Sequence, residues 1–238
     1  MDTTKDVHTH HISQKFNEEL NDAKKHLMDL GGLVEKQVAD AIESLVEANS
    51  ELASAVQREE INVDNMEIFV DQECTRILAK RQPAASDLRL VLMVSKTTAD
   101  LERIGDEANK IARHAITLCE DDKSPRGYVE VRHIGVLVKQ MLNASLDAFA
   151  RFDVDAALDV VQQDKTVDQE YRSALRELIT YMMEDPRSIT RVMNIMWVLR
   201  SLERIGDHAR NVAEHVIYLV KGLDVRHTSV EEIKQKML

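Results

Sequence analysis

Two identical hexapeptides, Leu-Glu-Arg-Ile-Gly-Asp, occur at residues 101–106 and 202–207. Each copy lies in a stretch of helical periodicity and sets two carboxylates one turn apart, as Glu102 and Asp106 illustrate. Like charges at this spacing repel each other and destabilise a helix unless a cation neutralises them. The hexapeptides therefore predict either a bound cation or ion pairs with nearby basic side chains.

The same carboxylate spacing recurs on the helical stretch that precedes each hexapeptide. If each pair of stretches packs side by side, four carboxylates in each half of the chain converge on one site, as in carboxylate metal proteins built on helical bundles. Asn211, one turn after the second hexapeptide, is a further candidate ligand. The candidate metal ligands are Glu60, Asp64, Glu102, Asp106, Asp164, Asp168, Glu203, Asp207 and Asn211.

Oxygen donors select hard cations such as Mg²⁺, Ca²⁺ or Mn²⁺, or iron. They disfavour structural zinc, which prefers cysteine and histidine, although zinc stays among the possible cations together with iron, magnesium and manganese. Glu67 and Asp71 repeat the spacing one heptad further on but correspond to Tyr171 and Leu175 in the second half, which makes them weaker candidates. Lys110 replaces Asn211 in the first half, so we expect its ammonium group to weaken metal binding there.

Surface ion pairs are the competing interpretation of these acids. Asp106 has Lys110 four residues on, and Asp207 has Arg210 three residues on. Against this, a mid-helix glycine such as Gly105 costs about 1 kcal/mol relative to alanine, and both hexapeptides contain one. We therefore expect a helix or a ligand to approach each glycine closely.

Composition predicts an all-α protein. The chain of 238 residues has a hydrophobic share of 44%, only 7 Gly, 3 Pro and 4% aromatic residues, which favours long helices around a large core. A net charge of -11 disfavours binding to nucleic acid. Cys74 and Cys119 cannot form a disulfide framework, and neither a signal peptide nor a membrane span is evident, so we expect a cytoplasmic protein.

An internal duplication organises the chain. Residues 33–64 align without gaps on residues 137–168 at an offset of 104, and the hexapeptides align at an offset of 101. Each copy predicts three antiparallel helices joined by short turns, and hence two tandem three-helix bundles. The expected helices are 16–48, 51–79, 87–119, 129–152, 154–183 and 186–221; the expected domains are 12–119 and 128–222, with flexible ends at 1–11 and 224–238.

Two groups of residues are candidates for contact with a partner protein. Phe149, Arg151 and Phe152 lie at a turn of the second copy, and aromatic residues and arginine are favoured at interfaces. Both rings are equally suited to closing the end of the bundle core, which is the stronger of the two interpretations. The second group is Lys80, Arg81 and Arg89, which could instead cap helix ends.

Three features together resemble the PhoU family of bacterial phosphate-specific transport system accessory proteins, over residues 12–222. They are the two hexapeptides, the loop Arg-Gln-Pro at 81–83 with Ser-Asp-Leu-Arg at 86–89, and Tyr-Met-Met-Glu-Asp at 181–185. The resemblance implies two three-helix bundles, frequent dimerisation, and iron or other metal clusters at the acidic motifs. The eight carboxylates named above match those motifs, while Lys110 departs from the asparagine of more symmetric copies.

The resemblance also implies function. Members are regarded as negative regulators of the phosphate-starvation response, which link the ABC phosphate transporter and its ATPase to a sensor histidine kinase, restrain phosphate uptake and reach the membrane only through these partners. No motif indicates an independent enzyme. One alternative is a carboxylate-bridged di-metal enzyme, although the Glu-x-x-His pattern of that class is absent around the acidic pairs. The other alternative is a metal-free helical scaffold.

Overall fold

The structure, a computed structural model, describes residues 14–120, 128–226, 228, 232 and 233. These residues form long helices and no strand, which confirms the predicted all-α class. The side chain of Asn49 accepts a hydrogen bond from the Leu52 backbone nitrogen and so caps the second helix. The helices are α1 (Gln14–Val46), α2 (Ser50–Arg81), α3 (Ala85–Cys119), α4 (Tyr128–Arg151), α5 (Val154–Glu184) and α6 (Ile189–Lys221), with a 3₁₀ turn, η1 (Pro186–Ser188), before α6.

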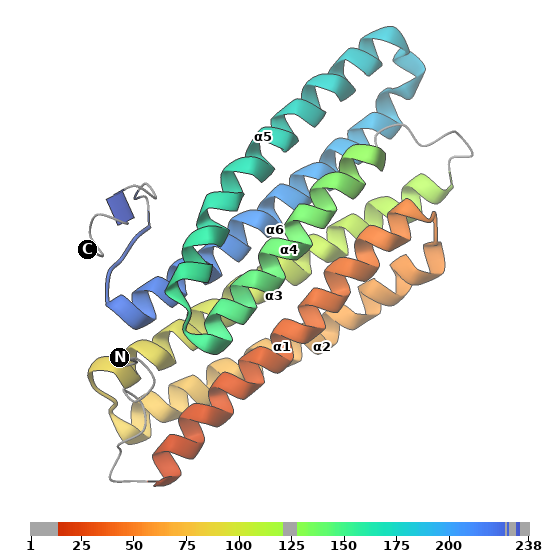
Figure 1. Ribbon diagram of the computed structural model, residues 1–238. Helices are drawn as coiled ribbons and strands as arrows, with labels where there is room; N and C mark the ends of the chain where they lie inside the picture. The colour runs from red at the N-terminus through yellow and green to blue at the C-terminus, as the bar shows by residue number, and fades with distance from the viewer. Residues whose placement is uncertain (1–13, 121–127, 227, 229–231, 234–238) are drawn as a thin grey trace.

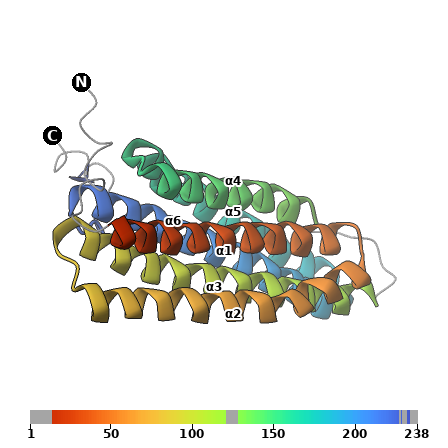
Figure 2. The ribbon, with the colours of Figure 1, turned by 90° about the horizontal axis from the view of Figure 1, so that it is seen from below.

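The predicted tandem bundles are confirmed, and they are joined along two helix pairs. Helices α1, α2 and α3 pack on one another, as do α4, α5 and α6. The third helices α3 and α6 pack together, and the first helices α1 and α4 do the same, which leaves α2 and α5 on opposite flanks (Figure 1, Figure 2). The two hexapeptides therefore lie on neighbouring helices in the middle of the molecule.

Both pairs of joining helices run antiparallel with an internal two-fold symmetry. A Cβ added to Gly31 of α1 would lie 2.9 Å from Leu146 Cδ2 of α4, and a Cβ added to Gly135 of α4 would lie 3.1 Å from Ile42 Cδ1 of α1. Gly31 corresponds to Gly135, and Ile42 to Leu146, at the offset of 104 found in the sequence. The missing side chains let the two repeats approach closely at equivalent points.

The chain after α6 departs from the expectation of a flexible end. Val225 and Ile233 are both fully buried, so the described part of residues 224–238 packs against the bundle. Gly222 ends α6 in a left-handed conformation, with φ 69°, and the guanidinium of Arg89 lies close to it. The expected flexible end at residues 1–11 lies outside the described residues.

The mid-helix glycines of the hexapeptides differ in their surroundings. A Cβ on Gly105 would lie 3.0 Å from Gln37 Oε1 and 3.2 Å from Val63 Cγ1, whereas a Cβ on Gly206 would lie 3.5 Å from its nearest neighbour, Val167 Cγ1. The expected close approach of a neighbouring helix is therefore found at Gly105, while Gly206 has room for a methyl group.

We expect Gly105→Ala to lower the free energy of unfolding by about 1 to 2 kcal/mol, because crowding outweighs the gain in helix propensity. Gly206→Ala is the matched control and should be neutral or stabilising by up to about 1 kcal/mol. Urea unfolding followed by circular dichroism measures both. Equal effects of the two substitutions would contradict the packing difference between the repeats.

Candidate functional site

In the second repeat, the four predicted acids lie on the facing helices α5 and α6. Glu203 is the most enclosed of the hexapeptide acids, with only 9% of its surface exposed. Its Oε1 accepts a hydrogen bond from Arg200 Nη1 at 2.6 Å, while its buried Oε2 has no hydrogen-bond partner. An unpaired buried carboxylate oxygen is costly, so this atom is suited to receiving a cation.

Glu203, Asp207 and Asp164 of this repeat have raised pKa values. Burial raises the pKa of Glu203 to about 7, and the neighbouring charges of Asp207, Asp168 and Asp164 add to the shift. Burial, followed by the charges of Asp164 and Asp168, raises the pKa of Asp207. The pKa of Asp164 is also raised, mainly by burial. The structure thus brings all four acids of the second repeat within electrostatic reach of one another.

Arg210 supplies a fixed positive charge beside this cluster. Its Nη1 donates to Asp164 Oδ2 at 3.0 Å, and its Nε donates to Glu214 Oε1 at 2.9 Å. The competing interpretation paired Arg210 with Asp207, but the long arginine side chain instead crosses to Asp164 of α5 and reaches Glu214 one turn along α6. Asp168 in turn accepts a hydrogen bond from Arg172 at 3.2 Å.

In the first repeat, the acids gather between α2 and α3 around a residue that the sequence ranked low. Burial raises the pKa of Glu102, and the charges of Asp106, Glu67 and Asp64 raise it further. Burial, Asp71 and Asp64 likewise raise the pKa of Glu67, so Glu67 belongs to this cluster although it has no counterpart in the second repeat. Its position three residues after Asp64, on the same helix face, was the available signal.

The remaining acids of the first repeat are less enclosed. Glu60 is half-buried one turn before Asp64, which is exposed. Asp71 accepts a hydrogen bond from Ser95 Oγ at 2.6 Å. Asp106 accepts a long hydrogen bond from Arg103 Nη1 at 3.5 Å.

The sequence suggested that Lys110 neutralises Asp106, but in the structure Lys110 pairs with Glu107 instead. Its Nζ donates to Glu107 Oε1 at 2.9 Å, and Arg204 Nη1 lies 2.9 Å from the same oxygen. Lys110 therefore lies over the contact between α3 and α6, away from the acidic cluster. Arginines contact predicted ligands in both repeats: Arg103 lies 3.3 Å from Glu102 and 3.5 Å from Asp106, and Arg210 donates to Asp164 at 3.0 Å.

Asn211 also lies at the contact between α3 and α6. Its Nδ2 donates to Asp100 Oδ1 at 3.0 Å, and the ring of His208 contacts the same oxygen at 2.8 Å. This arrangement corrects the expectation that Asn211 joins the acidic cluster of the second repeat, because its amide is engaged across the joint between the repeats.

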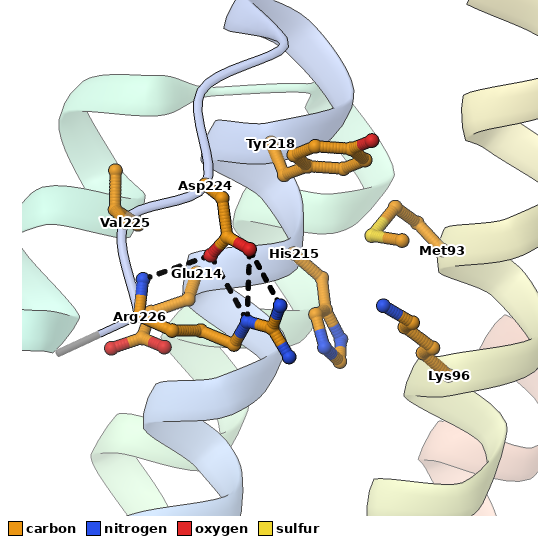
Figure 3. A pocket seen from close by; sticks show the side chains of 8 residues that line it. All are labelled: Met93, Lys96, Glu214, His215, Tyr218, Asp224, Val225 and Arg226. Carbon is orange, nitrogen blue, oxygen red and sulfur yellow. Dashed lines mark hydrogen bonds and ion pairs between the residues drawn. The ribbon is translucent and has the colours of Figure 1, made fainter.

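His215, on the same joint, lines a cavity beneath the chain that follows α6 (Figure 3). Its ring lies 3.1 Å from Thr97 Oγ1. Burial lowers the pKa of His215 to about 4, and the positive charges of Lys96 and Arg226 act in the same direction, against the opposing effect of Asp100. The imidazole is therefore neutral at physiological pH. Figure 3 shows Arg226, which also lines this cavity, paired with Asp224.

The first candidate partner surface is largely a packing feature. Phe149 has 0% of its surface exposed, so it closes the bundle core and cannot anchor a partner in this fold. Phe152 is half-buried beneath Lys24, whose Nζ lies 4.0 Å from the ring centroid and donates to the Ala150 carbonyl. Arg151 is exposed and pairs with Asp147.

The three residues of the second candidate surface, Lys80, Arg81 and Arg89, have different surroundings. Arg81 donates two hydrogen bonds to Glu19, at 2.7 and 2.9 Å, and so ties the end of α2 to the start of α1. Arg89 Nε donates to the Leu219 carbonyl at 3.3 Å, in the last turn of α6, as the capping interpretation predicts. Lys80 is exposed.

The acids fit a hard cation by their donor chemistry, although none is gathered tightly around a single point. Within residues 14–120, 128–226, 228, 232 and 233, His, Cys, Asp and Glu side chains nowhere form a group of three or more arranged to hold a metal ion. An unpaired carboxylate oxygen such as Oε2 of Glu203 has the donor chemistry that a hard cation prefers.

Comparison with known proteins decides the family. The model of the PhoU domain matches residues 27–115 and 131–216, which are the two repeats. The chain belongs to the PhoU family. It is 64% identical to the phosphate-specific transport system accessory protein PhoU homolog of Pseudomonas aeruginosa, over 98% of this chain and 96% of that protein. It is 47% identical to PhoU of Escherichia coli, over 94% of this chain and 92% of that protein.

Solved PhoU structures share this fold. The crystal structure of PhoU from Pseudomonas aeruginosa has a TM-score of 0.86 and 65% identity, and the match covers 87% of this chain and 100% of that one. The structure of the phosphate transport system regulatory protein PhoU from Streptococcus pneumoniae has a TM-score of 0.81 at 27% identity, covering 87% and 98% of the two chains. The described helices include none that is long and apolar enough to cross a bilayer.

Proposed function

We propose that this protein is a negative regulator of the phosphate-starvation response that couples the ABC phosphate transporter to a sensor histidine kinase and restrains phosphate uptake. The observation that carries the proposal is its similarity, along nearly the whole chain, to PhoU accessory proteins of phosphate-specific transport systems. The regulator acts in the cytoplasm by binding its partners, the kinase and the transporter ATPase, and it works as a homodimer. This role calls for binding surfaces and for no reaction of its own.

The carboxylate sites give this regulator a place to hold a cation. Asp164, Asp168, Glu203 and Asp207 would hold one in the second repeat. The acids of the first repeat, now with Glu67 among them, would hold another. A bound Mg²⁺, Mn²⁺ or iron ion would neutralise the mutual repulsion of these acids and so fix α2 on α3 and α5 on α6. The ion would serve a structural or sensory role.

The two sites should differ because Arg210 is half-buried and contacts Asp164 at 3.0 Å, whereas Arg103, the arginine beside the acids of the first repeat, is exposed and contacts them at 3.3 and 3.5 Å. Replacing Arg210 with glutamine should tighten Mn²⁺ binding there about ten-fold, because Asp164 then loses the positive charge it already contacts. The matched change in the first repeat is Asn109→Gln, which should leave affinity unchanged. Isothermal titration calorimetry at neutral pH measures both. If Arg210→Gln left the affinity unchanged, Arg210 would not compete with the metal.

Deletion of the gene tests the proposed regulatory sign. In phosphate-rich medium, a strain that lacks this protein should express a phosphate-starvation reporter such as alkaline phosphatase at a high level, and a plasmid copy should restore repression. Unchanged reporter activity after deletion would refute negative regulation. The same strains, assayed for uptake of radiolabelled phosphate, test whether the protein restrains the transporter.

A further inference from the structure

Helix α2, on the flank of the molecule, exposes large apolar side chains that none of the sites above uses (Figure 2). Ile61 is 65% exposed, Ile68 is 50% exposed and Phe69 is 45% exposed. Ile61 and Ile68 are one heptad apart, so they lie on one face of the helix. Phe69 lies next to this face, on the side of α1.

An open groove of about 530 Å³ between α1 and α2 continues this apolar face. Leu33 of α1 lines the groove together with Met66 and Phe69 of α2. Phe69 therefore belongs both to the groove and to the exposed face of α2. We call the apolar residues of the groove and the face the α2 surface: Leu33, Ile61, Met66, Ile68 and Phe69.

The acids of α2 along this surface are largely without counter-ions. Residues 51–75 contain seven Asp or Glu and only one Lys or Arg, which is Arg58. Of the seven acids, only Glu73 forms an ion pair with a residue that the structure describes, and its partners are His26 and Arg76. The negative charge along α2 is therefore not neutralised from within the described part of the chain.

Helix α1 adds acids on the other side of the groove. Asp22 and Asp29 lie one turn before the residues of α1 that line the groove, and both are exposed. Neither forms an ion pair with any residue that the structure describes. Two exposed lysines, Lys25 and Lys36, lie farther round α1 from the groove. Residues 14–81 contain fifteen acids against eight Lys or Arg, so this hairpin carries much of the net charge of -11.

The second repeat shows that the fold does not require this surface. Lys165, Arg172 and Ser173 of α5 stand at the positions of the three exposed apolar residues of α2, at the offset of 104. The matching stretch of α5, residues 155–179, contains six acids and three Lys or Arg. Two helices with the same place in their bundles thus differ in their outer faces, and only α2 combines exposed apolar residues with uncompensated acids.

We infer that the α2 surface binds a basic amphipathic helix of a partner protein. The apolar residues of that helix would cover Ile61, Ile68 and Phe69. Its Lys and Arg side chains would pair with Asp22 and Asp29 and with the acids of α2. Binding of an amphipathic helix in a groove between two helices is a common mode of recognition. The inference depends neither on metal binding nor on the regulatory sign.

Charge complementarity selects this occupant. Unpaired carboxylates beside an apolar face attract a cationic segment, and they repel nucleic acid and anionic lipid. A second copy meeting the first through α2 would bring like charges together, so this surface is not suited to self-association. The groove follows α2 from Glu59 to Phe69, a length of about 15 Å that matches about three turns of a partner helix.

Peptide binding tests the inference, with fluorescence anisotropy of a fluorescein label as the readout and a chelator present. The probe is a synthetic two-heptad helix with leucine on one face and lysine on the other. Its binding should be saturable and should weaken as NaCl rises from about 0.02 M to about 0.3 M. A probe with glutamate in place of lysine should not bind. A scrambled probe of the same composition should bind at least about five-fold more weakly.

Substitutions place the peptide on the α2 surface. Ile61→Lys combined with Ile68→Arg, the residues that the second repeat has at these positions, should weaken binding of the lysine probe about ten-fold. The matched control is Val129→Lys with Val136→Arg, which adds the same charges one heptad apart at exposed positions of α4. This control should change the affinity by less than about two-fold. Circular dichroism checks that both variants fold.

The acids beside the groove are tested separately from the apolar residues. Asp29→Asn should weaken binding of the lysine probe about four-fold. Asp159→Asn, at an exposed acid of α5, is the control and should change it by less than about two-fold.

Three results would overturn the inference. They are the absence of saturable binding of the lysine probe, equal binding of the scrambled probe, and equal weakening by the α2 and α4 double variants. Either of the last two would mean that the peptide responds only to the net charge of the molecule. Because these measurements use neither the transporter nor the kinase, a negative result leaves the proposed regulatory role untouched.

Discussion

Replacing Glu203 with glutamine should stabilise the metal-free protein by about 2 to 3 kcal/mol at about pH 8, an unusual gain for the loss of a carboxylate. Burial and three neighbouring acids raise the pKa of Glu203 to about 7. The folded protein therefore binds more protons than the unfolded chain between about pH 4.5 and pH 7. The favourable contribution of neutral Glu203 is complete below that range and is lost as the pH rises through it.

The measurement is urea unfolding of wild type and Glu203→Gln at a series of pH values in the presence of a chelator. The stability difference should be largest above about pH 7 and should close toward about pH 4.5. Glu177→Gln, on the exposed face of α5, is the control and should stay within about 0.5 kcal/mol of wild type at every pH. A Glu203→Gln variant less stable than wild type at high pH would contradict the burial argument.

Adding Mn²⁺ should make wild type more stable than Glu203→Gln, the reverse of the order expected without metal. At a concentration about 100 times its dissociation constant, a metal that binds only the folded state adds about 2.7 kcal/mol of stability. Wild type should gain this increment at its second site, whereas Glu203→Gln should lose most of it. Equal gains in both proteins would remove Glu203 from the ligand set.

Acidification should weaken the joint between the repeats through His215, with a loss of about 2 kcal/mol between about pH 6.5 and pH 5. Burial, Lys96 and Arg226 lower the pKa of this imidazole to about 4, against the opposing effect of Asp100. In this range the unfolded chain takes up a proton that the folded protein does not. The stabilising effect of the neutral His215 imidazole is therefore complete above about pH 6.5 and is lost as the pH falls.

A comparison of pH profiles isolates this contribution. His215→Gln should flatten the acid side of the stability profile, while His133→Gln, an exposed histidine of α4, should follow wild type. Chemical denaturation midpoints at about pH 7.5 and pH 5 are sufficient. Retention of the full wild-type pH dependence by His215→Gln would show that other groups cause it.

Local patterns in the sequence predicted most of the helices. The expected helices 16–48 and 51–79 match α1 and α2 to within two residues at each end, because helical periodicity and capping depend on neighbours within one or two turns. The packing of the segment after α6 was harder to predict, because the burial of Val225 and Ile233 depends on how α6 meets the rest of the bundle. Isolated apolar residues in a polar segment form no periodic pattern from which burial could be predicted.

The carboxylate sites were predictable as residues but not as pairings. Lys110 is four residues from Asp106 and three from Glu107, and both spacings place side chains together on a helix, so sequence could not choose between them. The structure pairs Lys110 with Glu107, which also contacts Arg204 of the neighbouring repeat. Ion pairs between repeats depend on the packing of α3 on α6, which no single-helix rule supplies.

The central claim is that the hexapeptide acids are part of the regulatory mechanism. The most direct test is phosphatase-reporter activity in phosphate-rich medium, in the deletion strain complemented with a variant whose four hexapeptide acids are changed to their amides (Glu102→Gln, Asp106→Asn, Glu203→Gln and Asp207→Asn). We predict high activity, close to that of the uncomplemented strain, from a variant that is folded and present at wild-type level. Full repression by that variant would contradict the claim and would leave the acids with no regulatory role.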